Sequence, residues 1–144
     1  MKKSPAEKNL VFETKYWKIL LADNQNYLGR CFIILKRECG DLAKVKKEEL
    51  LEFLEVVKKM ERALRKAFNA SLFNWGCLMN HAFQEKKPKP QVHWHLVPRY
   101  RKKVNFEGIV FEDLEFGFHY NHSKRMQVTE KVQNALIERI KSFL

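Results

Sequence analysis

The spacing of hydrophobic residues predicts two strands near the start of the chain. Residues 16–22 are mostly aromatic and aliphatic, and the polar segment 23–26 that follows is typical of a turn. A second apolar run covers residues 31–35 after Gly29. Its continuity is typical of a central strand that is covered on both faces.

Two later segments have the period of an amphipathic helix. Across residues 46–68, apolar side chains recur every three or four positions while Lys and Glu occupy the other face. These apolar positions are Leu50, Phe53, Leu54, Val57, Met60, Leu64 and Ala67. A shorter stripe near the C-terminus contains Val132, Leu136, Ile140 and Phe143. We interpret both stripes as faces packed against the core.

The region between the two helices predicts further strands. Residues 72–79 are predicted to form an apolar strand. Residues 80–90 are predicted to form a loop, because Pro88 and Pro90 lack the backbone N–H that strand pairing needs. Residues 91–97 form the next strand, and the chain is expected to turn at Pro98. The order of strands, helix, strands and helix predicts an α+β domain.

Composition limits the class of protein. The chain has 144 residues, of which 45% are hydrophobic and 31% are charged, as in a single globular domain. We expect residues 1–10 to be a flexible basic terminus and residues 11–144 to form the domain. The apolar runs are shorter than the roughly 20 residues of a membrane helix. No signal peptide is recognised at the start, which predicts a cytoplasmic location.

Charge indicates the kind of partner, and cysteine spacing indicates whether disulfides or a zinc site are present. The 28 Lys and Arg residues exceed the 17 Asp and Glu residues, giving a net charge of +11. This excess favours anionic partners such as nucleotides, phosphates, nucleic acid or acidic membranes, and charge alone does not choose among them. Cys31, Cys39 and Cys77 are odd in number and lack CxxC spacing, so neither disulfides nor a zinc site is predicted.

The predicted strand 91–97 carries the candidate chemistry. Side chains alternate along a strand, so Gln91, His93 and His95 share one face. The two histidines are then about 6.6 Å apart, close enough for one phosphate to contact both. A neutral imidazole is a good nucleophile near pH 7, and its neighbours can hydrogen-bond the phosphate oxygens. Taken alone, the His-x-His pattern more often marks a structural pair or an incidental metal-ligand pair than a catalytic one.

The surrounding sequence resembles the signature of the histidine triad superfamily. Residues 90–99, which read Pro-Gln-Val-His-Trp-His-Leu-Val-Pro-Arg, resemble that motif, in which three histidines alternate with apolar residues. The resemblance covers roughly residues 13–120 and includes the turn at 27–30 and the long helix after the next strand. It implies a histidine-triad-like fold, with a mainly antiparallel sheet, one long amphipathic helix and a C-terminal helix.

The resemblance also implies roles for individual residues. The middle triad position, His93, corresponds to the nucleophile, and His95 corresponds to the residue that contacts the α-phosphate. Asn80 is spaced like an asparagine beside the bound nucleotide. Asp23 or Asn24 lies near the position of a group that binds the ribose hydroxyls, and turn formation is the alternative role for both.

The sequence departs from the family at the first triad position, which is Gln91. A glutamine amide can donate to a phosphate oxygen but cannot relay a proton at neutral pH, so activity is expected to be altered or slow. Its backbone carbonyl, which orients the nucleophilic ring in relatives, is retained.

The other basic and histidine residues have weaker signals. The lysines of the preceding loop either hold distal phosphates as point charges or form a solvated loop. These are Lys86, Lys87 and Lys89. The remaining histidines lack a motif and are interpreted as structural or surface residues. They are His81, His119 and His122.

The leading interpretation is a nucleotide hydrolase that cleaves at the α-phosphate of diadenosine polyphosphates or adenylate conjugates through a nucleotidyl-histidine. This scheme requires no cofactor and no metal. Alternatives are a phosphorylase or nucleotidyltransferase, a protein that processes or binds adenylated nucleic acid, and a catalytically weak nucleotide sensor. Relatives commonly form homodimers, so the resemblance implies a homodimer here, with no membrane partner.

Overall fold

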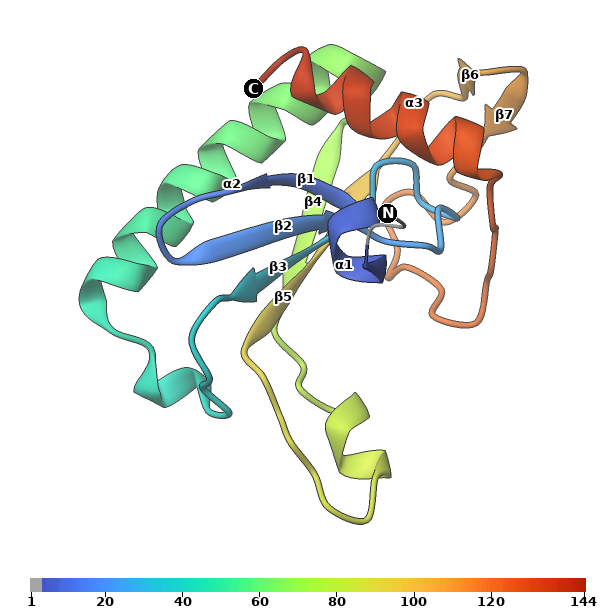
Figure 1. The fold of residues 1–144 in the computed structure, drawn as a ribbon. Coiled ribbons are helices and arrows are strands. Elements are labelled where there is room, and N and C mark those ends of the chain that lie inside the picture. Colours follow the sequence, from blue (N-terminus) through green and yellow to red (C-terminus); the bar gives the residue numbers. More distant parts are fainter. Residues whose placement is uncertain (1–3) are drawn as a thin grey trace.

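The centre of the protein is a five-stranded antiparallel sheet with the order β1-β2-β3-β5-β4 (Figure 1). The structure is a computed structural model and describes residues 4–144. The strands are β1 Leu10–Glu13, β2 Trp17–Leu21, β3 Cys31–Leu35, β4 Leu72–Gly76 and β5 His93–Arg99. The fold is therefore α+β with a mainly antiparallel sheet, which confirms the predicted class.

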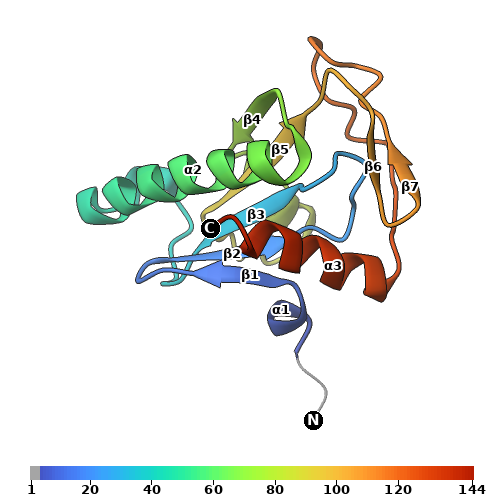
Figure 2. The ribbon, with the colours of Figure 1, turned by 90° about the horizontal axis from the view of Figure 1, so that it is seen from above.

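Two helices share one hydrophobic core with the sheet (Figure 2). Helix α2, Lys47–Phe68, crosses the sheet, and α3, Glu130–Lys141, lies against β1 and α2. Both helices lie where the stripes predicted them. The buried face of α2 differs in part from the prediction, because Leu50 and Leu54 are 51% and 49% exposed rather than packed against the core. Among the described residues, no helix is long and apolar enough to cross a membrane. The smaller elements are α1 Pro5–Lys8, η1 Leu42–Lys44, η2 His81–Gln84 and the hairpin of β6 Val104–Phe106 with β7 Ile109–Phe111.

Local contacts determine where α2 begins and ends and which face it buries. Glu49 in its first turn accepts the backbone N–H of Lys46, so its carboxylate satisfies a donor that the helix leaves free. Asn69 ends the helix with a φ of 61°, a left-handed conformation that asparagine tolerates. On the buried face, the Phe53 ring stacks on Trp94 of β5 with centroids 4.8 Å apart. The helix therefore covers the Trp94 face of β5.

The N-terminal segment has more structure than the predicted flexible terminus. Residues 1–3 of that segment lie outside the described residues. After them, Ser4 Oγ accepts the Glu7 backbone N–H, and Glu7 Oε2 accepts the Ser4 N–H at 2.8 Å. This reciprocal capping box stabilises the short α1. β1 then begins at Leu10, inside the segment that was expected to be flexible.

The strands around the histidines end at different residues from those predicted. β4 ends at Gly76 rather than at residue 79, and β5 starts at His93, not at residue 91. β5 also continues through Pro98, where a turn was expected. The pairing of β5 with β3 stops at Leu96, before Pro98. The strand can therefore continue through Pro98, because β3 does not need a backbone N–H at that position.

Candidate active site

β5 presents His93 and His95 on the sheet face opposite Trp94 and α2. The two imidazole centroids are 5.0 Å apart. Phe32 of β3 lies edge-on to both rings, with centroid distances of 6.4 Å to His93 and 5.1 Å to His95. The alternation along β5 thus places two imidazoles over an aromatic base.

The ring of His93 is held by the backbone. Its Nδ1 lies 2.8 Å from the carbonyl oxygen of Gln91. In the neutral tautomer in which Nδ1 carries the proton, this N–H donates to the carbonyl and Nε2 keeps a free lone pair. Burial raises the pKa of the nearby Cys77 thiol, although a hydrogen bond from the His93 backbone offsets part of this rise. The thiol is therefore not a competing thiolate near pH 7.

The second imidazole, His95, is held in its neutral form. Burial lowers its pKa to about 4, and electrostatic interactions with His93, Arg30 and His122 act in the same direction. Its Nδ1 is buried and has no hydrogen-bond partner among the described residues, and the same holds for Nε of Arg30. Unsatisfied buried polar atoms are costly, so the surroundings of His95 and Arg30 are not optimised for stability alone.

The side chain of Gln91 is used for structure, which corrects the expectation that it donates to phosphate. Its Nε2 donates to the carbonyl oxygens of Leu35 and Arg37, at 2.7 and 2.8 Å. Its Oε1 accepts the backbone N–H of Cys39 at 3.1 Å. Both amide hydrogens are therefore engaged, because Gln91 precedes β5 and lies beside the segment that leaves β3. Only its carbonyl reaches the histidines.

Asp23 and Asn24 line a concave pocket of about 400 Å³ that also includes Phe32 and Arg30. Asp23 Oδ1 accepts hydrogen bonds from Asn9 and Gln133, and Asn24 bonds the backbone of residues 124 and 126. Both residues therefore have structural partners as well as a position at the pocket wall. Phe32 connects this pocket to the histidines.

The other predicted binding residues lie on the loop between β4 and β5, which extends away from the sheet (Figure 1). Asn80 is exposed and begins η2 without a side-chain capping bond. The three loop lysines line a separate concavity of about 720 Å³, and no described contact joins them to His93 or His95. They are Lys86, Lys87 and Lys89. The structure does not bring them together with the histidine pair.

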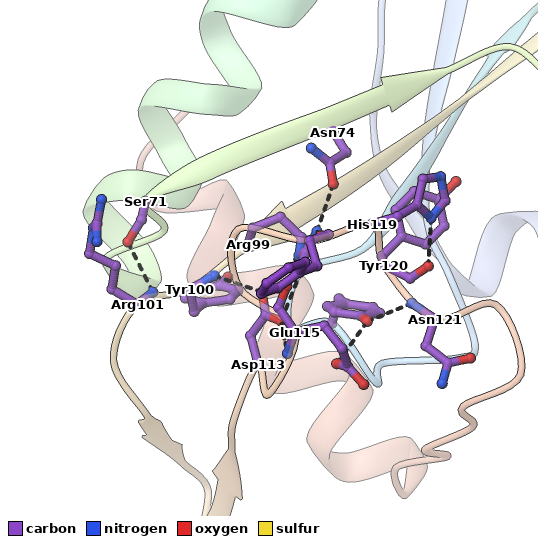
Figure 3. A network of polar contacts seen from close by, with 12 residues as sticks. Ser71, Asn74, Arg99, Tyr100, Arg101, Asp113, Glu115, His119, Tyr120 and Asn121 are labelled. Atoms are coloured by element: carbon purple, nitrogen blue, oxygen red, sulfur yellow. Dashed lines mark hydrogen bonds and ion pairs between the residues drawn. The ribbon is translucent and has the colours of Figure 1, made fainter.

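Residues 112–127, which the sequence left without an element, fold against the histidine face of the sheet. Arg99 forms a buried ion pair with Asp113 at 2.7 Å, each side chain being 1% exposed, and donates to the carbonyls of Glu115 and Phe118 (Figure 3). This network fixes the segment above the end of β5.

Aromatic contacts extend that network toward the histidines. Tyr120 is buried in one cluster with Tyr27 and Val97. The rings of His119 and His122 each lie 4.6 Å from the Tyr120 ring. Both histidines are exposed, as predicted, yet the charge of His122 acts on His95. The sequence placed Arg30 in the turn at 27–30 and Phe32 in the strand after it, but it assigned neither side chain a role. It missed the segment 112–127, because no local motif marks that segment.

Comparison with known proteins identifies the family. The family model of the HIT domain matches residues 3–102. The chain belongs to the HIT domain family. A curated relative, the asymmetrical bis(5'-nucleosyl)-tetraphosphatase of Schizosaccharomyces pombe, is 26% identical over 87 residues. The match covers 60% of this chain but only 47% of that relative, so the HIT chain spans about half of its length.

Solved structures share the fold of this HIT protein at low sequence identity. A histidine triad protein from Sinorhizobium meliloti 1021 has a TM-score of 0.70 at 15% identity, and the match covers 100% of this chain and 96% of that one. The diadenosine triphosphate hydrolase of Plasmodium falciparum, solved with Cyclomarin A, has a TM-score of 0.64 at 13% identity, covering 95% and 76% of the two chains. At these identities, the similarity establishes the fold alone.

Proposed function

We propose that this HIT protein is a nucleotide hydrolase that cleaves at the α-phosphate of diadenosine polyphosphates or adenylate conjugates. The observation that supports the proposal most strongly is the hydrogen bond between His93 Nδ1 and the Gln91 carbonyl, which directs the Nε2 lone pair away from the backbone. His95 stands beside it with a buried, unpartnered nitrogen. The names of the two hydrolases described above are consistent with this chemistry.

The proposed reaction has two steps. In the first, Nε2 of His93 attacks the α-phosphorus, a P–N bond forms, and the P–O bond to the leaving group breaks with its electron pair on oxygen. In the adduct, the imidazolium keeps its proton on Nδ1. This N–H donates a hydrogen bond to the Gln91 carbonyl, which stabilises the positive charge. In the second step, water attacks phosphorus, a P–O bond forms, and the P–N bond breaks with its electron pair returning to Nε2. The proton lost by the water is released to solvent.

The pocket beside Phe32 is the proposed site of the adenosine. Its volume of about 400 Å³ lies in the range of small-molecule sites, and Phe32 offers an aromatic surface adjacent to both imidazoles. Asp23 and Asn24 remain the proposed contacts for the ribose. Asn80 and the loop lysines are proposed contacts only if the projecting loop closes on the ligand.

Product analysis tests the proposal. Wild type, His93→Ala and the exposed control His81→Ala are incubated with diadenosine tetraphosphate, and the nucleotides are separated by chromatography. We expect AMP and ATP from wild type and His81→Ala, and none from His93→Ala. ADP appearing in place of AMP when inorganic phosphate is added would instead identify a phosphorylase, because phosphate then accepts the adenylyl group in place of water. Equal turnover by His93→Ala would refute the named nucleophile.

A nucleotide sensor is the second candidate function. It is favoured by the engagement of both Gln91 amide hydrogens, which leaves the first triad position without a proton donor for the leaving group. A sensor would bind diadenosine tetraphosphate without releasing products. Calorimetry beside the product assay separates binding from turnover.

We also propose that the protein forms a homodimer through β4 and α2. β4 is an edge strand, so its outer backbone groups can pair with a second copy. On α2, a run of exposed leucines forms an apolar strip. These are Leu50, Leu51 and Leu54, which are 51%, 58% and 49% exposed.

A further inference from the structure

Arg30 stands just before β3, and its side chain has no partner in the fold. Among the described residues, its guanidinium makes no hydrogen bond and no ion pair, and its Nε is buried. Such a group is costly to the folded state, because a desolvated donor is left unsatisfied. The side chain lines the pocket beside Phe32, and its two terminal nitrogens are not buried as Nε is. These nitrogens are therefore accessible to a ligand in that pocket.

The backbone of Arg30, in contrast, is held on both sides. Its N–H donates to the Tyr27 carbonyl at 3.0 Å, and its own carbonyl accepts the Ala22 N–H at 2.9 Å. The same carbonyl accepts the side-chain amide of Gln25 at 3.0 Å, and Gln25 is itself fully buried. The fold thus fixes the point from which an unpaired guanidinium extends, which lowers the entropic cost of binding a ligand there.

The guanidinium lies on the histidine face of the sheet. Arg30 and Phe32 are two positions apart and so point to the same side, and Phe32 pairs with His95. The Cζ atom of Arg30 is 5.9 Å from the centroid of the Phe32 ring, the ring that lies edge-on to both imidazoles. The interaction of Arg30 with His95 also contributes to the lowered pKa of that imidazole. Arg30 is therefore next to the position proposed for the α-phosphate.

Positive charge at this pocket wall is not neutralised by the protein. Burial lowers the pKa of Arg30, and repulsion from Arg125, which lines the same pocket, acts in the same direction. Asp23 is the carboxylate of that wall, but it accepts hydrogen bonds from Asn9 and Gln133, and the part of the chain that the structure describes shows no ion pair between it and Arg30. A guanidinium keeps its charge near pH 7, so the wall presents a cation that lacks a counter-ion.

We infer that Arg30 is a further catalytic residue, whose guanidinium binds the non-bridging oxygens of the α-phosphate beside His95. The inference rests on the proposed function, which assigns that phosphate to His93. Paired N–H groups of a guanidinium match two phosphate oxygens, and negative charge on these oxygens is stabilised during transfer. The amide of Gln91 is engaged by the backbone, and His95 is neutral, so Arg30 supplies the fixed positive charge at the phosphate.

A comparison of AMP with adenosine isolates this contact, since the two ligands differ only in the phosphate. Calorimetry with each ligand is performed on wild type, Arg30→Met, Arg30→Lys and the control Arg62→Met. Methionine keeps an unbranched stem without the charge, and lysine keeps the charge without the planar fork. Arg62 is exposed on α2, which covers the other face of the sheet, so its replacement changes the net charge equally.

Hydrogen bonds to a charged group contribute about tenfold to a hundredfold in affinity. We expect Arg30→Met to weaken AMP by at least the lower value and Arg30→Lys to weaken it less, with adenosine affinity unchanged in both. Arg62→Met should bind both ligands as wild type does. Urea unfolding should show Arg30→Met at least as stable as wild type, because a half-buried charge without a partner is removed.

The outcomes separate this inference from the hydrolase proposal. Equal losses for AMP and adenosine in Arg30→Met, or an unchanged AMP affinity, would overturn the phosphate contact and leave the hydrolase intact. AMP binding that depends on Arg30, in a protein that releases no products from diadenosine tetraphosphate, would support the contact and count against the hydrolase. Failure of wild type to bind either ligand would overturn both.

Discussion

Replacing Gln91 with alanine tests whether this side chain is a structural brace. The substitution removes three hydrogen bonds to backbone groups of residues 35–39, at the end of β3 and just after it, with lengths of 2.7, 2.8 and 3.1 Å. It leaves the Gln91 carbonyl that orients His93 in place. The free energy of unfolding should therefore fall, while the orientation of the His93 ring is kept.

The magnitude follows from the three bonds. Each contributes about 1 kcal/mol net, so Gln91→Ala should lower the free energy of unfolding by about 3 kcal/mol. With a denaturant slope of about 2 kcal/mol/M, the urea midpoint shifts down by about 1.5 M. Gln91→His, which restores the family triad, should also destabilise the protein, because a neutral imidazole has one donor and cannot replace two.

Urea unfolding followed by tryptophan fluorescence measures this effect. The matched control is Gln84→Ala, on the exposed loop between β4 and β5, which should change stability by less than about 0.5 kcal/mol. A Gln91→Ala variant as stable as this control would refute the brace. So would a Gln91→His variant more stable than wild type.

Three further predictions concern stability, pH and assembly. Asp113→Asn breaks the buried pair with Arg99 and should cost about 3–5 kcal/mol in urea unfolding, whereas Glu112→Gln, in an exposed pair, should cost under about 1 kcal/mol. Because the folded-state pKa of His95 is lowered to about 4, the unfolded chain binds more protons below pH 6.5; stability should fall as pH drops toward 4, and less so in His95→Gln. Light scattering should show Leu54→Glu as a monomer, and a monomeric wild type would contradict the proposed dimer.

The sequence predicted the elements whose residues carry a local period. Helix α2 and the central strand β3 follow from their apolar residues. The extent of their burial was overestimated, because Leu50 and Leu54 are exposed and the Phe32 face of β3 is only half-buried. The path of β5 through Pro98 was missed because it depends on where the neighbouring strand stops pairing. Likewise, β1 is recognisable only from its partner β2, since a short edge strand has too few residues for a clear pattern.

The candidate site divides in the same way. His93 and His95 were predicted because alternation along one strand places them together. The pocket beside Phe32 is completed by a segment distant in sequence that includes Arg125. Asn24 hydrogen-bonds the backbone of Lys124 and Met126 in this segment, 100 or more positions later. The use of the Gln91 amide also depends on a tertiary contact, with the chain that follows β3. No local spacing carries this information.

Direct detection of the covalent intermediate is the measurement that tests the central claim. Wild-type protein is mixed with diadenosine tetraphosphate, quenched in base to preserve a P–N bond, and examined by intact mass and peptide mapping, with His95→Ala and His93→Ala beside it. The account predicts one adenylyl group on His93 in wild type and none in His93→Ala. An adenylyl group on His95, or product formation by His93→Ala, would contradict it.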